Sequence, residues 1–127
     1  MDHTGRIGSP YARAFDNSCK GFTHSPENNK IFLIKQQAMA NRILQTRGWI
    51  FLNEVYEMLG FKKTQAGATV GWWYDPKDRL NDNFVDFGLS EIMYQDVRDF
   101  VNEYECMVLL DFNVDGPIFD KVYPDKY

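Results

Sequence analysis

The strongest hydrophobic pattern in the chain predicts a long helix over residues 26–47. Ser25 is suited to cap the free amides of its first turn, Pro26 to occupy its first position, and Gly48 to end it in a left-handed conformation. Between these signals the apolar side chains recur at helical spacing. They are Ile31, Phe32, Leu33, Ile34, Ala38, Met39, Ile43 and Leu44.

A second, shorter helix is predicted directly after this one. Residues 49–52 are apolar and are interpreted as a short linker between the two helices. Asn53 can cap a helix over residues 54–59, and Gly60 provides its stop signal.

Beyond residue 69 the pattern changes to one typical of strands. Residues 70–74 and 84–87 are dense in aromatic and β-branched side chains, and the polar stretch 75–83 separates them. This arrangement predicts a β-hairpin with a long tip. Helical spacing returns over residues 90–103, and a strand is predicted over residues 108–114, followed by a turn at 115–117.

The order of these elements predicts an α+β fold with a small antiparallel sheet covered on one face by helices. Residues 1–25 are rich in small and polar side chains and are interpreted as an N-terminal arm that packs on the surface through Tyr11 and Phe15. Residues 26–127 are expected to form a single globular domain.

Composition and charge narrow the classes of function. The 127 residues are 44% hydrophobic and 16% aromatic, enough for a core and inconsistent with a disordered chain. A net charge of −4 argues against binding duplex nucleic acid, which requires clustered Lys and Arg. The longest apolar runs are far shorter than the ~20 residues of a membrane-spanning helix, and no secretory signal is recognised. We therefore expect a cytoplasmic protein without a membrane partner.

One local motif is similar to the first half of a calcium-binding loop. Asp111, Asn113 and Asp115 alternate and are followed by Gly116, as in the pattern D-x-[DN]-x-[DN]-G. The twelfth position of such a loop supplies a bidentate Glu, but Val122 occupies it here. A strand with alternating faces that ends in an Asp-Gly turn explains the same residues, and we favour that interpretation.

The motifs of common enzymes are absent from the sequence: HExxH, paired CxxC, GxSxG, Walker and GxGxxG patterns do not occur. We therefore expect a non-enzymatic protein without a cofactor. The most suggestive surface combines three consecutive aromatic residues with nearby cations, which could stack on a base or anchor a protein and meet phosphate or acidic groups. The candidate ligand-binding residues are Trp72, Trp73, Tyr74, Lys62, Lys63 and Arg79. The competing interpretation is that both faces of the aromatic strand are buried.

Several stretches resemble a known family when taken in order along the chain. They are residues 11–16 (YARAFD), 48–60 (GWIFLNEVYEMLG), 70–72 (VGW), 82–88 (DNFVDFG) and 109–116 (LLDFNVDG). Together they are similar to an uncharacterised family of small proteins of tailed bacteriophages of Gram-positive hosts, known as a domain of unknown function. The resemblance implies expression in the cytoplasm of an infected bacterium, and it supplies no catalytic residues.

Two functions are favoured by these observations, and a hydrolase without a recognised motif is the third alternative. The first is a phage-encoded binding protein that counters host defence by sequestering a nucleotide-type immune signal or by binding a host defence protein. The second is a structural or assembly protein of the virion, for which a symmetric homo-oligomer is expected.

Overall fold

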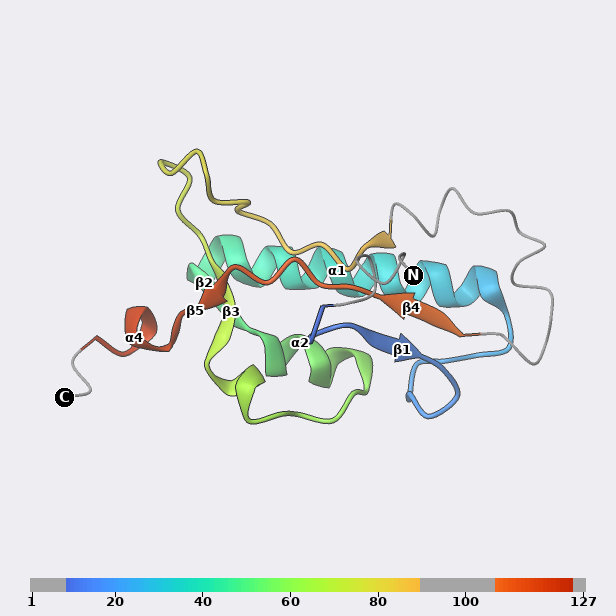
Figure 1. Cartoon of the computed structure of the whole chain (residues 1–127). Coiled ribbons are helices and arrows are strands. Elements are labelled where there is room, and N and C mark those ends of the chain that lie inside the picture. Colours follow the sequence, from blue (N-terminus) through green and yellow to red (C-terminus); the bar gives the residue numbers. More distant parts are fainter. Residues whose placement is uncertain (1–8, 90–106, 125–127) are drawn as a thin grey trace, which may run out of the picture.

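Helix α1, Pro26–Arg47, runs lengthwise past both sheets of the molecule in the computed structural model, which describes residues 9–89 and 107–124 (Figure 1). Its predicted boundaries are confirmed. The Ser25 hydroxyl accepts a hydrogen bond from the Asn28 N–H at 3.2 Å, and Gly48 closes the helix with a φ of 97°. Helix α2 spans Leu52–Leu59 and ends at Gly60, as predicted, but it begins two residues before the predicted start.

The strands form two antiparallel sheets. β1, Arg13–Phe15, pairs with β4, Val108–Leu110. β2, Trp49–Phe51, pairs with β3, Val70–Trp73, which also pairs with the two-residue strand β5, Gly116–Pro117. A 3₁₀ turn at Ala66–Ala68 and the short helix α4, Phe119–Val122, complete the described elements. The three-stranded sheet lies toward the C-terminal end of α1 and the two-stranded sheet nearer its N-terminal half (Figure 1).

The α+β fold class is confirmed, and the sheet is divided in two. Residues 49–52, predicted as a linker, supply strand β2 and the first residue of α2. Within β2, Ile50 pairs with Trp72 across the sheet, and both side chains are fully buried. Part of the predicted arm is also structural, since it forms β1 and places Phe15 in the core with no exposed surface. The helix predicted over residues 90–103 lies outside the described residues. Among the described helices, none has the length and apolarity needed to cross a membrane.

The buried face of α1 is narrower than its hydrophobic pattern predicts. Leu33, Ala40 and Leu44 have no exposed surface, whereas Ile31 and Met39 are 52% and 47% exposed. The core packs against this stripe from both sheets and from α2. Its largest fully buried side chains are Trp72, Tyr56, Phe15, Phe87, Leu33, Leu44, Ile50, Leu52, Leu59, Leu110 and Val55.

The predicted hairpin between residues 70–74 and 84–87 is wrong, because β3 pairs with β2 and β5 instead. Residues 84–87 are held by side-chain amides. On one side, Asn41 of α1 accepts from the Val85 N–H at 2.7 Å and donates to the Val85 carbonyl at 3.0 Å. One helical turn away, Gln37 accepts from the Phe87 N–H at 2.8 Å.

These two amides match the repeat of an extended chain. Residues four apart on a helix are about 6 Å apart along its axis, and residues two apart on a strand are about 6.6 Å apart. Gln37 and Asn41 therefore reach Phe87 and Val85 in register. On the other side, Asn113 accepts from the Asp86 N–H at 2.7 Å and donates to the Phe84 carbonyl at 3.0 Å. Backbone bonds also reach this side, because the N–H groups of Asp111 and Asn113 donate to the Phe87 and Asp86 carbonyls, each at 3.2 Å. The segment is thus bonded on both sides as a central strand would be, by side chains alone on the α1 side.

Three more asparagines hold loops in the same way. Each accepts a hydrogen bond from a backbone N–H and donates one to the carbonyl of the same residue. The pairs are Asn29 with Thr23, Asn53 with Thr64, and Asn83 with Asp75. Asn53 is therefore occupied by the loop after α2 and does not cap that helix as predicted. In this fold, amide side chains satisfy irregular backbone that no sheet ladder reaches.

Candidate functional site

Trp72, the first of the predicted binding aromatics, belongs to the core. It has no exposed surface, and its indole Nε1–H donates to Asn113 at 2.8 Å. A ligand cannot reach this ring without unfolding the sheet. Tyr74 is half-buried and packs against the same core, while its backbone N–H bonds to the Gly48 carbonyl at 2.9 Å. Of the three aromatics, Trp73 is the one that the strand turns to the opposite, outer face.

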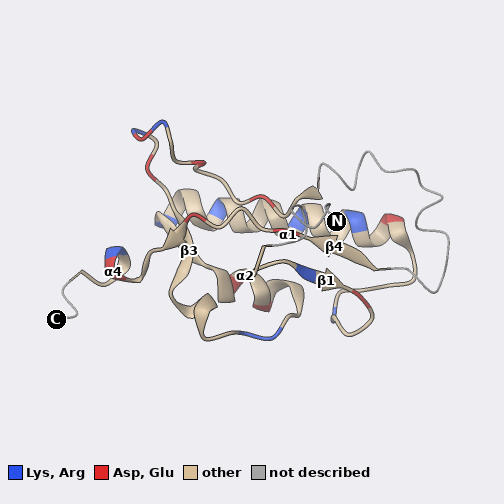
Figure 2. Ribbon diagram, in the orientation of Figure 1, with Lys and Arg blue, Asp and Glu red and all other residues tan. Residues whose placement is uncertain are grey.

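The predicted cations do not gather beside Trp73. Lys62 and Lys63 are exposed in the loop after α2, along the lower edge of the molecule (Figure 2). Arg79 is exposed in loop 75–83, which projects from the opposite, upper edge. Lys63 forms an exposed ion pair with Glu57 at 3.4 Å. The structure therefore divides the predicted site among the core and two separate loops.

The calcium-like motif is used for internal bonding. The Asn113 side chain forms four hydrogen bonds. Its oxygen accepts from Trp72 and Asp86, and its amide nitrogen donates to Asp82 and Phe84. Asp115 accepts from the Trp73 N–H at 2.9 Å. Oδ1 of Asp111 is buried without a hydrogen-bond partner among the described residues. Within residues 9–89 and 107–124, no group of three His, Cys, Asp or Glu side chains is placed to hold a metal ion.

The surface that the structure assembles around Trp73 is an aromatic face on the outer side of the three-stranded sheet. Trp49 and Trp73 are cross-strand partners, and Phe51 lies two residues along β2, so the three side chains share that side. Ile50 and Trp72 point to the opposite side, which is the core. Phe119 of helix α4 and Tyr123, which follows that helix, extend the surface with two further rings. We define the aromatic face as Trp49, Phe51, Trp73, Phe119 and Tyr123.

Four rings of the aromatic face, those of Trp49, Phe51, Phe119 and Tyr123, contact one another in sequence. The Trp49 and Phe51 centroids are 5.4 Å apart with an edge-to-face geometry. Phe51 is 6.5 Å from Phe119, and Phe119 is 5.0 Å from Tyr123. Tyr123 is 46% exposed, and Trp49, Phe51 and Trp73 are half-buried. The result is a continuous, partly solvent-exposed aromatic surface.

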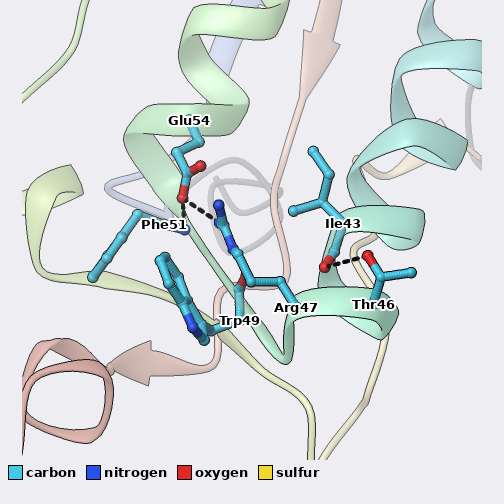
Figure 3. A network of polar contacts seen from close by, with 6 residues as sticks. All are labelled: Ile43, Thr46, Arg47, Trp49, Phe51 and Glu54. Atoms are coloured by element: carbon cyan, nitrogen blue, oxygen red, sulfur yellow. Dashed lines mark hydrogen bonds and ion pairs between the residues drawn. The ribbon is translucent and has the colours of Figure 1, made fainter.

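Two cations lie on the indole rings of this face. The Arg47 guanidinium stacks 3.7 Å from the centroid of Trp49, and the Lys121 ammonium is 5.5 Å from that of Trp73. Figure 3 shows how Arg47 is fixed: its Nε donates to the Trp49 carbonyl at 3.0 Å, and its Nη2 meets Glu54 at 2.7 Å. Glu54 also accepts from the Phe51 N–H at 2.9 Å. These contacts tie the last turn of α1 to the first turn of α2 across β2.

Asp115 adds one negative charge beside Trp73. Burial raises the pKa of the Asp115 carboxyl above its ordinary value, the Trp73 N–H lowers it, the Asp82 carboxylate raises it, and Lys121 lowers it. The net result is an upward shift, which makes the ionised form less favourable than in water. Lys121 forms no ion pair with a carboxylate within 4.0 Å among the described residues, so its charge remains available to a partner.

Sequence reasoning found Trp73 but missed the other members of the aromatic face. Trp49 and Phe51 alternate around Ile50, which is a two-residue period that indicates a strand with one outer face. That signal was present within the segment taken for a linker. Nothing in the local sequence indicates that Phe119, Lys121 and Tyr123 return to the same sheet, because that placement depends on the pairing of β5 with β3.

In a comparison with known protein families, a family described as of unknown function, DUF6353, matches residues 2–122. Neither the curated proteins nor the solved structures give a match.

Proposed function

The chain belongs to the DUF6353 family, which carries no assigned activity, and we propose from the geometry of its surface that it is a non-enzymatic binding protein. The aromatic face is the proposed binding surface. The single observation that carries this proposal is the run of contacting, partly exposed rings from Trp49 to Tyr123. Tyr, Trp and Arg are the residues that dominate binding energy at protein interfaces, and all three are present here.

A protein partner fits this surface better than a nucleotide does. Base stacking needs an open ring face, and the Arg47 guanidinium already covers one face of Trp49 at 3.7 Å. Arg47 also forms hydrogen bonds with the Trp49 carbonyl and with Glu54, so a base would have to break these contacts to reach that ring face. A protein can instead bury the ring edges and place an acidic side chain beside Lys121. We therefore propose a partner surface that combines apolar side chains with a carboxylate near the Trp73 end.

The biological setting is part of the proposal and is supported by the sequence motifs described above. Their resemblance to tailed-phage proteins supports expression in the cytoplasm of an infected bacterium. There the protein would counter host defence by binding a defence protein, with sequestration of a nucleotide-type immune signal as the alternative ligand. A structural or assembly role in the virion is the second candidate, in which the same aromatic face would join subunits.

The proposal is tested by native mass spectrometry of the tagged protein recovered from phage-infected cells. The wild type is compared with Lys121→Glu and Tyr123→Ala, which change exposed positions of the aromatic face, and with the control Leu80→Ala. Leu80 is 94% exposed in loop 75–83, outside the aromatic face.

A host protein retained by the wild type and L80A, but lost from K121E and Y123A, supports the proposal. A small-molecule adduct with the same pattern would identify a nucleotide-type ligand. Copurification with assembled particles would favour the virion role. Retention of the same species by all variants would contradict a binding role for this face.

A further inference from the structure

Strand β2 lies at the edge of the three-stranded sheet, and its outward backbone groups can be identified from the register. Tyr74 N–H bonds to the Gly48 carbonyl, and Ile50 lies opposite Trp72. In an antiparallel ladder the backbone groups of every second residue bond to the same neighbouring strand. The backbone N–H and carbonyl groups of Gly48 and Ile50 therefore point toward β3. The backbone groups of Trp49 and Phe51 consequently face away from the sheet. An edge of this kind is a template for another strand.

The Arg47–Glu54 ion pair covers this edge. Arg47 supplies a donor to the Trp49 carbonyl at 3.0 Å, and Glu54 supplies an acceptor to the Phe51 N–H at 2.9 Å. The two side chains are joined at 2.7 Å, so they form one bridge along the strand (Figure 3). A donor for one carbonyl and an acceptor for one N–H is also what a neighbouring strand would offer.

The two covered groups are self-complementary. If two copies of β2 run antiparallel about a two-fold axis at Ile50, the Phe51 N–H of each copy meets the Trp49 carbonyl of the other. These are the two bonds that Arg47 and Glu54 now satisfy internally. The pairing would also place Trp49 and Phe51 of both copies on one face of a continuous six-stranded sheet.

We propose that β2 is a self-pairing edge whose partner is β2 of a second copy of this chain, and that the Arg47–Glu54 ion pair holds the edge closed in the monomer. The ion pair is suited to opening because its side chains are 37% and 36% exposed, so water and salt compete for both charges. This inference requires no other protein and is independent of the proposed host partner.

The first test compares sedimentation velocity of the wild type, Arg47→Ala and Glu54→Ala across a concentration series. R47A frees the Trp49 carbonyl and E54A frees the Phe51 N–H, so each should raise the dimer association constant by about tenfold or more. Lys63→Ala is the matched control, because it removes the exposed Lys63–Glu57 ion pair away from β2. K63A should sediment as the wild type does.

A second pair of variants identifies the surface used. Phe51 has φ −83° and ψ 152°, which proline can adopt, and the preceding residue is in a strand, as proline prefers. R47A/F51A loses the ring but keeps the N–H, whereas R47A/F51P loses both. The first should dimerise and the second should be monomeric.

Circular dichroism establishes that each variant is folded. If R47A is unfolded, E54A takes its place in the comparison with the wild type. Folded R47A and E54A proteins that associate no more than the wild type and K63A would overturn the proposal. Equal dimerisation of R47A/F51P and R47A/F51A would also overturn it, since the backbone edge would then not be the contact.

Discussion

Asn41 pairs with Val85 as one strand residue pairs with its neighbour across a ladder. Its carboxamide accepts from the Val85 N–H at 2.7 Å and donates to the Val85 carbonyl at 3.0 Å. Asn41 belongs to a helix, so a helical side chain provides here what a sheet provides elsewhere. Because the Val85 side chain has no exposed surface, the surrounding core leaves water little access to these backbone groups.

Removing this amide should destabilise the fold strongly. Asn41→Ala leaves the N–H and the carbonyl of Val85 unpaired, and each such group costs roughly 1–3 kcal/mol, so we expect a loss of about 2–6 kcal/mol in the free energy of unfolding. Urea denaturation followed by circular dichroism measures it. Gln45→Ala, at an exposed position one turn further along α1, is the control and should change stability by less than about 0.5 kcal/mol. Equal effects of the two substitutions would contradict this role of the Asn41 side chain.

Asn113 should tolerate neither removal nor conversion to an acid. Asn113→Asp keeps both acceptors but turns the amide donor into an oxygen that faces the Asp82 carboxylate and the Phe84 carbonyl. We expect N113D to lower the free energy of unfolding by about 2–4 kcal/mol. The double variant N113D/D82N restores a donor and should recover part of the loss, which a double-mutant cycle by chemical denaturation would reveal. Strict additivity of the two changes would disprove the contact.

Gly71 should be required because β2 approaches it closely. A Cβ at this position would lie 2.2 Å from the Ile50 carbonyl oxygen and 2.8 Å from Phe51 Cα, both of which are backbone atoms. Gly71→Ala should therefore cost about 3 kcal/mol, at the upper end of ordinary overpacking. Gly48→Ala is the comparison, since a Cβ there meets nothing within 4 Å and only the φ of +97° opposes it.

The cost of G48A should be about 1–2 kcal/mol, which is the strain of a left-handed residue. Thermal denaturation of both variants checks the order. A G71A protein as stable as G48A would show that the sheet widens at a cost no greater than the strain at Gly48.

Asp115 should make stability depend on pH in a defined direction. Its folded-state pKa lies above the ordinary value of 3.8, so the unfolded chain loses this proton first as pH rises. As pH rises from near the ordinary pKa, the contribution of Asp115 to the free energy of unfolding therefore decreases. It stays at this lower value at neutral pH. Asp115→Asn should raise the melting temperature at pH 7, and the difference should shrink below the ordinary pKa. A constant difference across pH would contradict this origin.

Local signals predicted the helices well and the strand partners poorly. Ser25, Pro26 and Gly48 fix α1 through contacts within a few residues, and the structure confirms both ends. Residues 84–87 show the opposite case. An extended segment has the same two-residue pattern whether its neighbour is a strand or a row of amides, so its sequence could not reveal Gln37, Asn41 and Asn113 as partners.

The candidate site was predictable only in part, for a related reason. Trp73 stands out in the sequence, but which of two adjacent tryptophans faces solvent depends on the phase of the strand, and Trp72 proved to be the buried one. Proximity in sequence indicates the wrong cations for Trp73. Those that reach the aromatic face, Arg47 and Lys121, come from 26 residues before and 48 after it, through the pairing of β2, β3 and β5.

The asparagine side chains that hydrogen-bond to loop backbone expose this fold to slow chemical inactivation, in addition to setting its thermodynamic stability. Asparagine is among the thermolabile residues, because its amide can hydrolyse to a carboxylate. At Asn29, Asn41, Asn53 and Asn83 such deamidation would replace the hydrogen-bond donor with a second acceptor facing a carbonyl oxygen. Deamidation of a single asparagine would therefore break the hydrogen bonds that hold a loop in place. Storage at high temperature should reduce the folded fraction irreversibly, in step with the appearance of +1 Da species at these positions.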